Sequence, residues 1–384
     1  MNLAVDATER DLAAAVAEWA RALETRIGPA EKAGEIPRDL IAELSELGVL
    51  GMTIPEKDGG LGASSLAFAL VMEELAAAWP SLAVAVAVSS GIVAGSIVRY
   101  GSAEQRARWL PRLTDGRGLG AFALSEPSAG SDAAAIGSMA RPDGSGYAIE
   151  GRKQFVTNAR YAPFAIVFAR VGAVDPVRSH AGITAFVVPL DAAGVAIGPA
   201  ERKLGLRASD TSALVLDGVR VGEDAVLGQV GAGFALALAG LDGGRIGIAA
   251  QSVGIARAAL ARARTYAKQR RQFGRPIAEF DGVRFPLATL ASEVDAARML
   301  TLRAAWLRDQ GRPFTREAAM AKLYASEMAQ RATHAAVQIH GGNGYMREYA
   351  VERYERDGRA TTIYEGTSEI QRLVIARSLL LGAA

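Results

Sequence analysis

The segment Ala121-Phe-Ala-Leu-Ser-Glu-Pro-Ser-Ala-Gly-Ser-Asp132 marks the point at which the pattern of the chain changes. Before it, apolar residues recur at helical spacing with charges between them. After it come the β-rich stretches 165–171 and 183–189, and no long helical pattern returns before about Gly228. Small residues and hydroxyl groups let backbone N–H groups approach a ligand closely, although an ordinary Gly/Ser turn has the same composition. We therefore expect a boundary between a helical and a β region here, and a candidate binding loop.

Helical spacing returns after this β region in four long Ala-rich stretches, at about 234–269, 280–310, 316–339 and 367–381. A length of 384 residues corresponds to two or three units of ordinary size. We predict an α+β fold in three parts. They are an N-terminal α-helical domain (1–117), a middle β-barrel or β-sandwich domain (118–229) and a C-terminal four-helix bundle (230–384).

Several shorter elements follow from the local pattern. It predicts one apolar helix at about 80–100, a short amphipathic helix at 103–113, strand-like stretches separated by a glycine in 147–157, and a strand, turn and strand in 213–221.

Composition excludes several classes of function. Lys and Arg number 43 against 41 Asp and Glu, and this balance argues against a dedicated nucleic-acid binder. The absence of cysteine excludes disulfides, Cys-ligated metals and a Cys nucleophile, so any redox chemistry must come from a bound cofactor. Three histidines and no HExxH pattern make a His-rich metal site a poor explanation, and we predict no metal. The low share of Lys among the basic residues, with abundant Ala and Gly, is typical of a GC-rich bacterial genome.

Targeting signals are not evident. The N-terminus is acidic and has no basic stretch before an apolar core, unlike a signal peptide. The uncharged run 75–98 is long enough to cross a membrane, but Pro80 interrupts it and much of it is Ala, Gly and Ser. We interpret it as a buried core helix, and expect no membrane span and a cytoplasmic protein.

Common nucleotide and hydrolase motifs are missing from the sequence. No GxGxxG follows a predicted strand, no Gly-Lys dipeptide supports a P-loop, and no GxSxG is present.

Three further segments carry candidate chemistry, although each taken alone also fits a structural role. In 151–158, Phe155 and Thr157 would share one face of a strand, where they could cover a flat ring and donate a hydrogen bond to it. The segment 338–345 is a glycine cluster at a helix end. In 363–372, Glu365 precedes a helix that Thr367 or Ser368 can cap. A carboxylate among apolar groups has a raised pKa, as a general base near neutral pH requires.

Taken together and in order, these segments resemble the acyl-CoA dehydrogenase family. The resemblance covers nearly the whole chain and lies in four stretches, 123–135, 270–276, 338–357 and 364–372. It implies FAD bound between the β domain and the C-terminal helices, and oxidation of an acyl-CoA to the trans-2-enoyl-CoA. It also implies electron-transfer flavoprotein as electron acceptor and a homotetramer built as a dimer of dimers.

The resemblance assigns Glu365 as the base that removes the α-proton while the β-hydrogen leaves as hydride to flavin N5. The thioester carbonyl would be held by the backbone N–H of Glu365 and a ribityl hydroxyl. Some relatives carry the base at the position occupied here by Gly244, which strengthens the assignment of Glu365. Phe155 stands where many members have Trp, and Asp281 stands where Gln is common, which puts an FAD contact there in doubt.

The remaining site residues also follow from the resemblance. Those implied to bind FAD are Phe122, Leu124, Ser125, Gly130, Ser131, Phe155, Thr157, Arg270, Gln272, Phe273, Gln338, Ile339, Gly341, Gly342, Thr367 and Glu369. Those implied to bind substrate are Ser131, Asp242, Arg245, Tyr364 and Gly366. Arg270 to Phe273 and Gln338 to Gly342 are expected to reach the FAD of a neighbouring subunit.

Three alternatives remain open. The acyl group could be carried by a carrier protein rather than CoA, the fold could serve a flavin oxidase or monooxygenase, or the protein could be a helical scaffold without catalysis. The small apolar residues between Ala83 and Gly91 favour a short or medium straight or branched acyl group.

Overall fold

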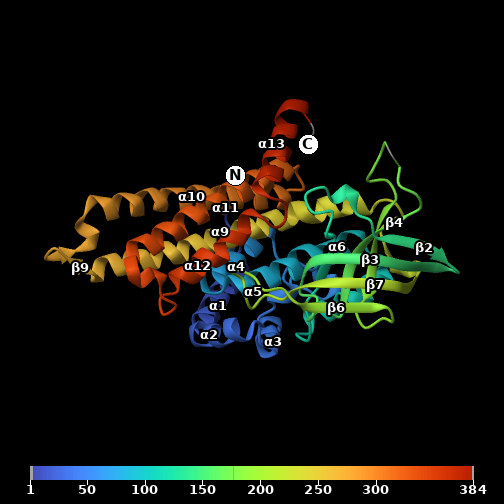
Figure 1. Cartoon of the computed structure of the whole chain (residues 1–384), viewed down its shortest axis with the longest axis horizontal. Helices are drawn as coiled ribbons and strands as arrows, with labels where there is room; N and C mark the ends of the chain where they lie inside the picture. Colours follow the sequence, from blue (N-terminus) through green and yellow to red (C-terminus); the bar gives the residue numbers. More distant parts are fainter. Residues whose placement is uncertain (1–2, 176, 383–384) are drawn as a thin grey trace.

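The computed structural model describes residues 3–175 and 177–382. The molecule is elongated, with helices over most of its length and a β-sheet at one end (Figure 1). The predicted order of a helical, a β and a second helical part is confirmed.

The N-terminal part is a set of helices that begin at capping side chains. Asp6 accepts a hydrogen bond from the N–H of Glu9 at 2.8 Å, and Ser64 caps the central helix of this part in the same way. The predicted helix 103–113 is divided in two at Pro111, which takes the first position of the second helix. The helices are α1 (Ala7–Arg21), α2 (Glu24–Ala33), α3 (Arg38–Glu46), α4 (Ser65–Ala78), α5 (Pro80–Val86), α6 (Ala94–Tyr100), α7 (Ala103–Trp109) and α8 (Pro111–Thr114).

The predicted apolar helix 80–100 is not a regular α-helix throughout. A π-helical segment, η3 (Ala87–Val93), lies between α5 and α6. Two helical stretches, Pro80–Tyr100 and Gly233–Gln269, are long and apolar enough to cross a membrane by length and composition. Their most apolar windows are 89% and 61% buried inside the protein, as in core helices of a folded domain.

The middle part is one eight-stranded mixed sheet with the strand order β6-β7-β3-β2-β4-β5-β8. The strand β1, from the segment that marks the fold boundary, pairs in parallel with β4, with Ala121 opposite Ala165. The strands are β1 (Ala121–Ala123), β2 (Met139–Asp143), β3 (Gly146–Thr157), β4 (Phe164–Val171), β5 (Ile183–Pro189), β6 (Val195–Ala200), β7 (Thr211–Gly222) and β8 (Val226–Leu227).

Two bulges correct the expected pattern in this sheet. The predicted turn within 213–221 is wrong, because β7 runs through it as one strand and Gly218, at φ 61°, absorbs an extra residue against β3. The second bulge lies in β3 itself, where Phe155 adopts φ 57° between the paired residues Lys153 and Val156. The two predicted stretches of 147–157 are therefore one bulged strand.

The C-terminal part contains the four predicted long helices and one short helix. The long helix α9 (Gly233–Gln269) packs along α11 (Thr315–His340), α10 (Asp281–Asp309) and the N-terminal α4. The helical parts at the two ends of the chain share one hydrophobic core. The other elements are β9 (Arg271–Gln272), β10 (Arg275–Pro276), η7 (Gly341–Tyr345), α12 (Val351–Gly358), η8 (Arg359–Thr362) and α13 (Ser368–Leu381).

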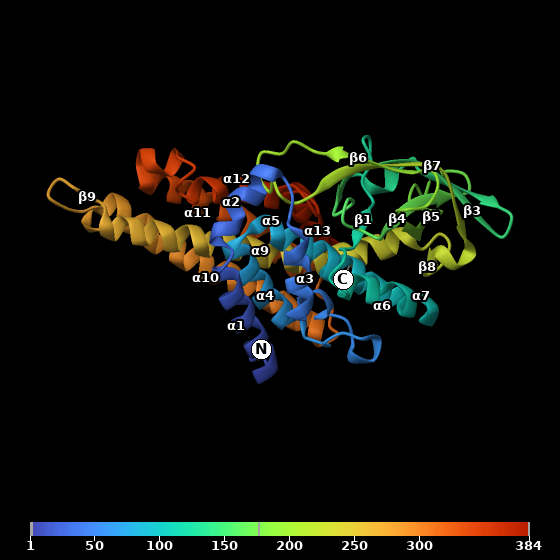
Figure 2. The ribbon, with the colours of Figure 1, turned by 90° about the horizontal axis from the view of Figure 1, so that it is seen from below.

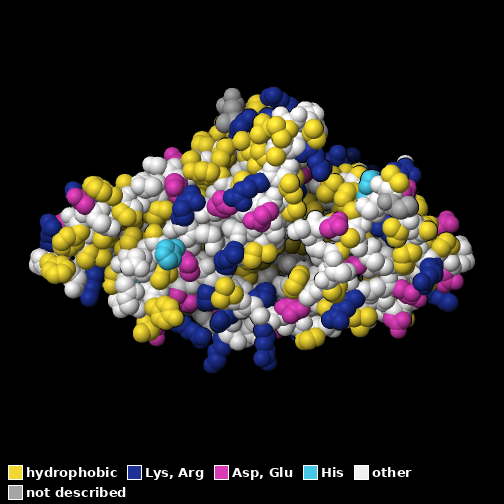
Figure 3. Space-filling view, turned by 45° about the horizontal axis from the view of Figure 1, so that its top comes forward, with side chains coloured by type: hydrophobic (Ala, Val, Ile, Leu, Met, Phe, Trp, Pro, Cys, Tyr) yellow, Lys and Arg dark blue, Asp and Glu magenta, His cyan; other side chains and the backbone are white. Residues whose placement is uncertain are grey.

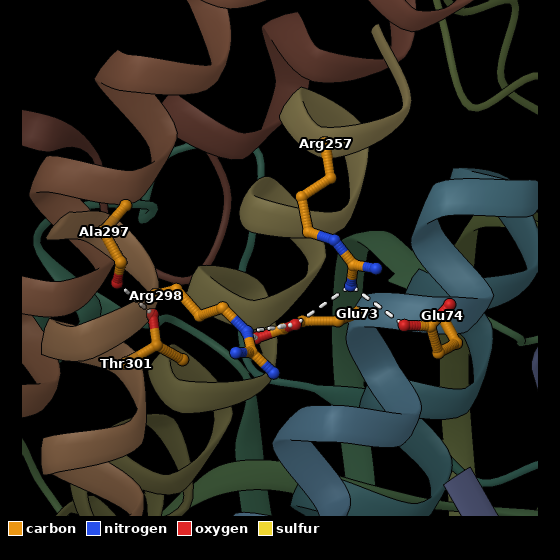
Figure 4. Close-up of polar contacts among 6 residues, drawn as sticks. All are labelled: Glu73, Glu74, Arg257, Ala297, Arg298 and Thr301. Atoms are coloured by element: carbon orange, nitrogen blue, oxygen red, sulfur yellow. Dashed lines mark hydrogen bonds and ion pairs between the residues drawn. The ribbon is translucent and has the colours of Figure 1, made fainter. Parts of the chain in front are cut away.

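A buried carboxylate joins three of these helices. Figure 4 shows Glu73 of α4 between Arg257 of α9 and Arg298 of α10, at 3.1 and 2.8 Å. The side chain of Glu73 is 1% exposed, while each arginine keeps about a third of its surface in solvent. This network fixes the mutual position of the helices on which the candidate site is built.

Candidate active site

Glu365 lies in the turn between η8 and α13. Its backbone is left-handed, with φ 51°, and Gly366 follows at φ 90°. Thr367 caps α13, as its position predicts, by accepting a hydrogen bond from the N–H of Ile370 at 3.4 Å. Glu369, in the first turn of α13, is exposed.

The carboxylate of Glu365 is in an unusual environment. Both of its oxygens are buried, and neither has a hydrogen-bond partner among the described residues. Burial raises the pKa of Glu365 to about 7, while the charges of Lys322 and Arg245 oppose that rise. A carboxylate with this pKa can accept a proton at neutral pH more readily than an ordinary glutamate.

Gly244 of α9 faces this carboxylate. A Cβ atom at position 244 would lie 2.2 Å from Oε2 of Glu365 and 2.9 Å from Cδ1 of Ile92. One helical turn away, a Cβ atom at Gly240 would lie 3.5 Å from Ile92 and 3.9 Å from the ring of Phe122. The structure therefore brings the predicted binding loop and Glu365 to adjacent turns of α9, and position 244 reaches the same space as the carboxylate.

The predicted substrate residues Asp242 and Arg245 form a buried ion pair on the same helix. Nη1 of Arg245 lies 2.5 Å from Oδ1 of Asp242, and Thr315 donates a hydrogen bond to the other carboxylate oxygen at 2.6 Å. Burial raises the pKa of Asp242 and lowers that of Arg245. Nε of Arg245 is buried without a partner in the described part of the chain, so it remains available as a donor.

Tyr364 is held by a residue that sequence reasoning missed. Its hydroxyl donates to Oε1 of Gln251 at 2.7 Å, and Nε2 of Gln251 donates to the carbonyl of Pro80 at 3.0 Å. Gln251 is fully buried in the middle of α9. A long amide side chain among the small and apolar residues 246–256 was the available signal.

The predicted binding loop leaves the sheet directly after β1. The ring of Phe122 packs on Phe168 with centroids 4.9 Å apart, and Leu124 is buried. Further along the loop, Gly130 and Ser131 are exposed.

A second buried ion pair, also missed from the sequence, supports this loop. Glu126 accepts hydrogen bonds from Nζ of Lys153 at 2.7 Å and from the hydroxyl and N–H of Ser138 at 2.6 and 3.0 Å. The Lys153 side chain has no exposed surface, and burial lowers its pKa to about 8. The pair joins the loop to β3, so the conformation of 122–131 depends on the neighbouring strand.

Phe155 and Thr157 lie at the end of β3, but regular strand alternation does not place them. The bulge puts Phe155 in the left-handed region and leaves the residue 62% exposed. Phe155 and Thr157 are both more exposed than Val156 between them, and their sharing of one face stays a prediction. An exposed aromatic ring beside a half-buried hydroxyl still offers an apolar surface and a donor to a planar ligand.

The remaining predicted FAD residues lie far from this group within one chain. Arg270, Gln272 and Phe273 are exposed at the hairpin of β9 and β10, and Phe273 has φ 50°. Figures 1 and 2 both place this hairpin at the end of the molecule opposite the sheet. The second cluster, Gln338 to Gly342, ends α11 beside a cleft of about 440 Å³ lined by Tyr266, Gln269 and His340.

Two smaller predictions can be placed. Asp281 begins α10 and forms an exposed ion pair with Arg284 at 2.6 Å. Within residues 3–175 and 177–382, no group of three or more His, Asp or Glu side chains is arranged to hold a metal ion.

Lys322 is a further residue that the sequence analysis overlooked. It is fully buried on α11, and its Nζ donates a hydrogen bond to the carbonyl of Gly366 at 2.7 Å. The available signal was a lysine on the face of the helix that Ala318 and Ala325 bury.

Three models of one protein family together match almost the whole chain. Residues 6–117 match the acyl-CoA dehydrogenase N-terminal domain, residues 121–219 its middle domain, and residues 231–380 its C-terminal domain.

Individual relatives match over almost the full length. The chain is 45% identical over 350 residues to the mitochondrial short-chain specific acyl-CoA dehydrogenase of Bos taurus, covering 91% of this chain and 84% of the relative. The structure of butyryl-CoA dehydrogenase from Megasphaera elsdenii is similar at a TM-score of 0.95 and 39% identity, covering 99% of this chain and 100% of that one. A glutaryl-CoA dehydrogenase from Mycobacterium smegmatis, solved in complex with FADH2, is similar at 0.92 and 32%, covering 99% and 96%. This chain belongs to the acyl-CoA dehydrogenase family of FAD-dependent oxidoreductases.

Proposed function

We propose that this protein oxidises a short-chain acyl-CoA to the trans-2-enoyl-CoA, with Glu365 as the base that removes the α-proton. The observation that carries the proposal is the buried, unpartnered carboxylate of Glu365, whose pKa burial raises to about 7. A base of this kind is ionised in a useful fraction at neutral pH and has no competing hydrogen bond to lose.

The residues of the binding loop and of the end of β3 fit a flavin. The exposed ring of Phe155 offers an apolar surface, and Thr157 and Ser125 offer hydroxyl donors beside it. Phe122 and Ile92 both flank Gly240 of α9, and Ile92 also lies with the carboxylate of Glu365 at Gly244, one helical turn further on. When bound there, FAD supplies the hydride acceptor for the β-hydrogen.

The chain itself supplies the proton chemistry and the orientation. Glu365 takes the α-proton, and its own backbone N–H, which is bonded to no acceptor in the described residues, can donate to the thioester carbonyl. Arg245 brings a positive charge near the developing enolate. Apolar and glycine neighbours such as Ile92 and Gly244 keep water away from the carboxylate, which sustains its raised pKa.

The side chains packed around the middle of α9 and the helix 80–93 favour a short acyl group. Ala83 and Ala87 are buried small residues. Two glycines could leave space for a longer acyl chain, but the ring of Phe68 occupies that space. The ring lies 3.1 Å from a Cβ position at Gly91 and 3.2 Å from one at Gly247. The names of the short-chain and butyryl-CoA relatives support the same choice of substrate.

Assembly as a homotetramer, a dimer of dimers, would bring the distant FAD residues to a neighbouring flavin. Their position at the end opposite the sheet supports this (Figures 1 and 2). Figure 3 shows hydrophobic side chains gathered over α13, where Leu373, Leu379 and Leu380 are exposed, an apolar surface suited to subunit contact. Electrons would pass on to an electron-transfer flavoprotein.

The experiment is anaerobic mixing of the yellow holoenzyme with saturated acyl-CoAs from C4 to C16 and with the same acyl groups on a carrier protein. Bleaching of the flavin should be fastest with short acyl-CoAs, and Glu365→Gln should retain FAD yet lose at least ~1000-fold in rate. Faster bleaching with the carrier-protein substrates would favour the biosynthetic alternative. Rapid reoxidation of the reduced flavin by oxygen would favour an oxidase or monooxygenase. A colourless protein that takes up no FAD would refute the proposal.

A further inference from the structure

Lys322 is a buried cation to which the proposed chemistry gives no role. Its side chain lies on the buried face of α11 with no exposed surface. Burying an ammonium group is unfavourable unless it is paired and hydrogen-bonded. In the described part of the chain, no carboxylate oxygen lies within ion-pair distance of its Nζ, and its hydrogen bond goes to the carbonyl of Gly366 at 2.7 Å.

That carbonyl belongs to the turn that carries Glu365. A left-handed backbone is unfavourable for a residue with a side chain, so a turn with Glu365 at φ 51° needs support from its surroundings. Two side chains from different helices provide it. Lys322 of α11 binds the Gly366 carbonyl, and Nε2 of Gln371 on α13 donates to the carbonyls of Glu365 and Gly366 at 3.2 and 2.8 Å.

The charge of Lys322 also acts on the carboxylate. Two cations oppose the effect of burial on Glu365, Lys322 from α11 and Arg245 from α9, and Lys322 has the larger influence. The charged groups that face Lys322 in turn are Glu365, Arg245, Glu369 and Glu327. Burial lowers the pKa of Lys322 to about 8, so it remains mostly protonated at neutral pH.

We propose that Lys322 is a positioning residue for the base: its ammonium fixes the turn through the Gly366 carbonyl and holds the Glu365 carboxylate in its ionised form near neutral pH. The inference rests on the proposed function, in which Glu365 removes the α-proton. It assigns two separable effects to one side chain, a hydrogen bond that sets where the carboxylate lies and a charge that sets when it is ionised.

Substitutions can separate the two effects in the FAD-loaded enzyme. Lys322→Met removes the donor and the charge, Lys322→Gln retains a neutral donor, and Lys322→Arg retains the charge. The matched control is Lys203→Met, because Nζ of Lys203 also donates to a backbone carbonyl, that of Ser209, at 2.8 Å, but outside the site. The readouts are the pH dependence of kcat/KM with butyryl-CoA, and direct titration of the Glu365 carboxyl by infrared difference spectra against Glu365→Gln.

Lys322→Met and Lys322→Gln both remove the cation. In these variants the acid limb of the kcat/KM profile and the titration of the Glu365 carboxyl should move to higher pH by roughly half a unit or more. In Lys322→Arg the acid limb of the kcat/KM profile should stay at the pH of the wild type. Displacement of the turn should lower kcat by about 10- to 100-fold in Lys322→Met and by less in Lys322→Gln. Lys203→Met should leave both readouts unchanged, even if the protein unfolds at a lower temperature.

A wild-type acid limb in folded, FAD-loaded Lys322→Met would overturn the proposal. If Lys322→Met does not fold, the same result in Lys322→Gln overturns it. The proposed function fails separately, when Glu365→Gln turns over at a near-wild-type rate. If Glu365→Gln is inactive while the Lys322 variants titrate like the wild type, only the role of Lys322 is refuted.

Discussion

Replacing Glu365 by Gln should make the protein more stable at alkaline pH while it removes activity. The two side chains have nearly the same shape, but only glutamate ionises. Both oxygens of the wild-type carboxylate are buried and accept no hydrogen bond from the part of the chain that the structure describes, so the charge is unfavourable in the folded protein. The substitution removes that unfavourable charge without opening a cavity.

The size of the effect follows from the pKa. Burial raises the pKa of Glu365 from 4.5 to about 7, so the folded state binds the proton more tightly than the unfolded state. The tighter binding of this proton therefore adds its full contribution to the free energy of unfolding below about pH 4.5, and the contribution is lost as pH rises to about 7. At about 1.4 kcal/mol per pKa unit, the wild type should lose about 3 kcal/mol relative to Glu365→Gln over this range. Above about pH 7 the carboxylate is ionised in both the folded and the unfolded state, so it adds no further pH dependence to the difference.

Urea unfolding of both FAD-loaded proteins between about pH 5 and pH 8.5 measures this difference. Glu46→Gln, at an exposed carboxylate on α3, is the control. Its free energy of unfolding should not rise relative to the wild type in this way as pH increases. A difference between wild type and Glu365→Gln that does not change with pH would refute the reasoning. A difference in the free energy of unfolding that becomes smaller as pH rises would also refute it, because that result would require a carboxylate stabilised by partners.

Two further substitutions test the geometry around the base. Gly244→Ala should lower kcat by about 100-fold with FAD retained, because the new Cβ would lie 2.2 Å from Oε2 of Glu365. Gly282→Ala, at a helical glycine with open space around it, is the control, and equal activity of both variants would contradict the assignment. Gln251→Leu should lower the free energy of unfolding by about 1–3 kcal/mol and reduce kcat/KM, because it leaves the buried hydroxyl of Tyr364 without its acceptor. Urea unfolding and steady-state kinetics check this, and a variant as stable and active as the wild type would count against a role for Gln251.

The long helices were predictable because their apolar residues repeat at helical spacing over many turns. This is why the ranges expected for α9 and α11 agree with the structure to within a few residues. The cap at Thr367 was predictable for a similar reason, since capping depends on neighbours within one turn.

Features that depend on distant pairing were not predictable. The bulge at Phe155 arises from the register of β3 against β7, which lies more than fifty residues further along the chain. The contact of Tyr364 with Gln251 joins residues 113 positions apart, and Lys153 meets Glu126 only after the sheet has formed. Local periodicity carries no information on such partners, so a single sequence indicates the candidate residues but not what holds them.

The most direct test of the central claim is the pH dependence of anaerobic flavin reduction by butyryl-CoA. If Glu365 is the base, the rate of reduction should fall about tenfold per pH unit below about pH 7 and level off above it, in keeping with the raised pKa of the carboxyl. Glu365→Gln should show almost no reduction at any pH. A flat rate between about pH 5.5 and pH 8.5 in the wild type, or the same profile in both proteins, would contradict the account.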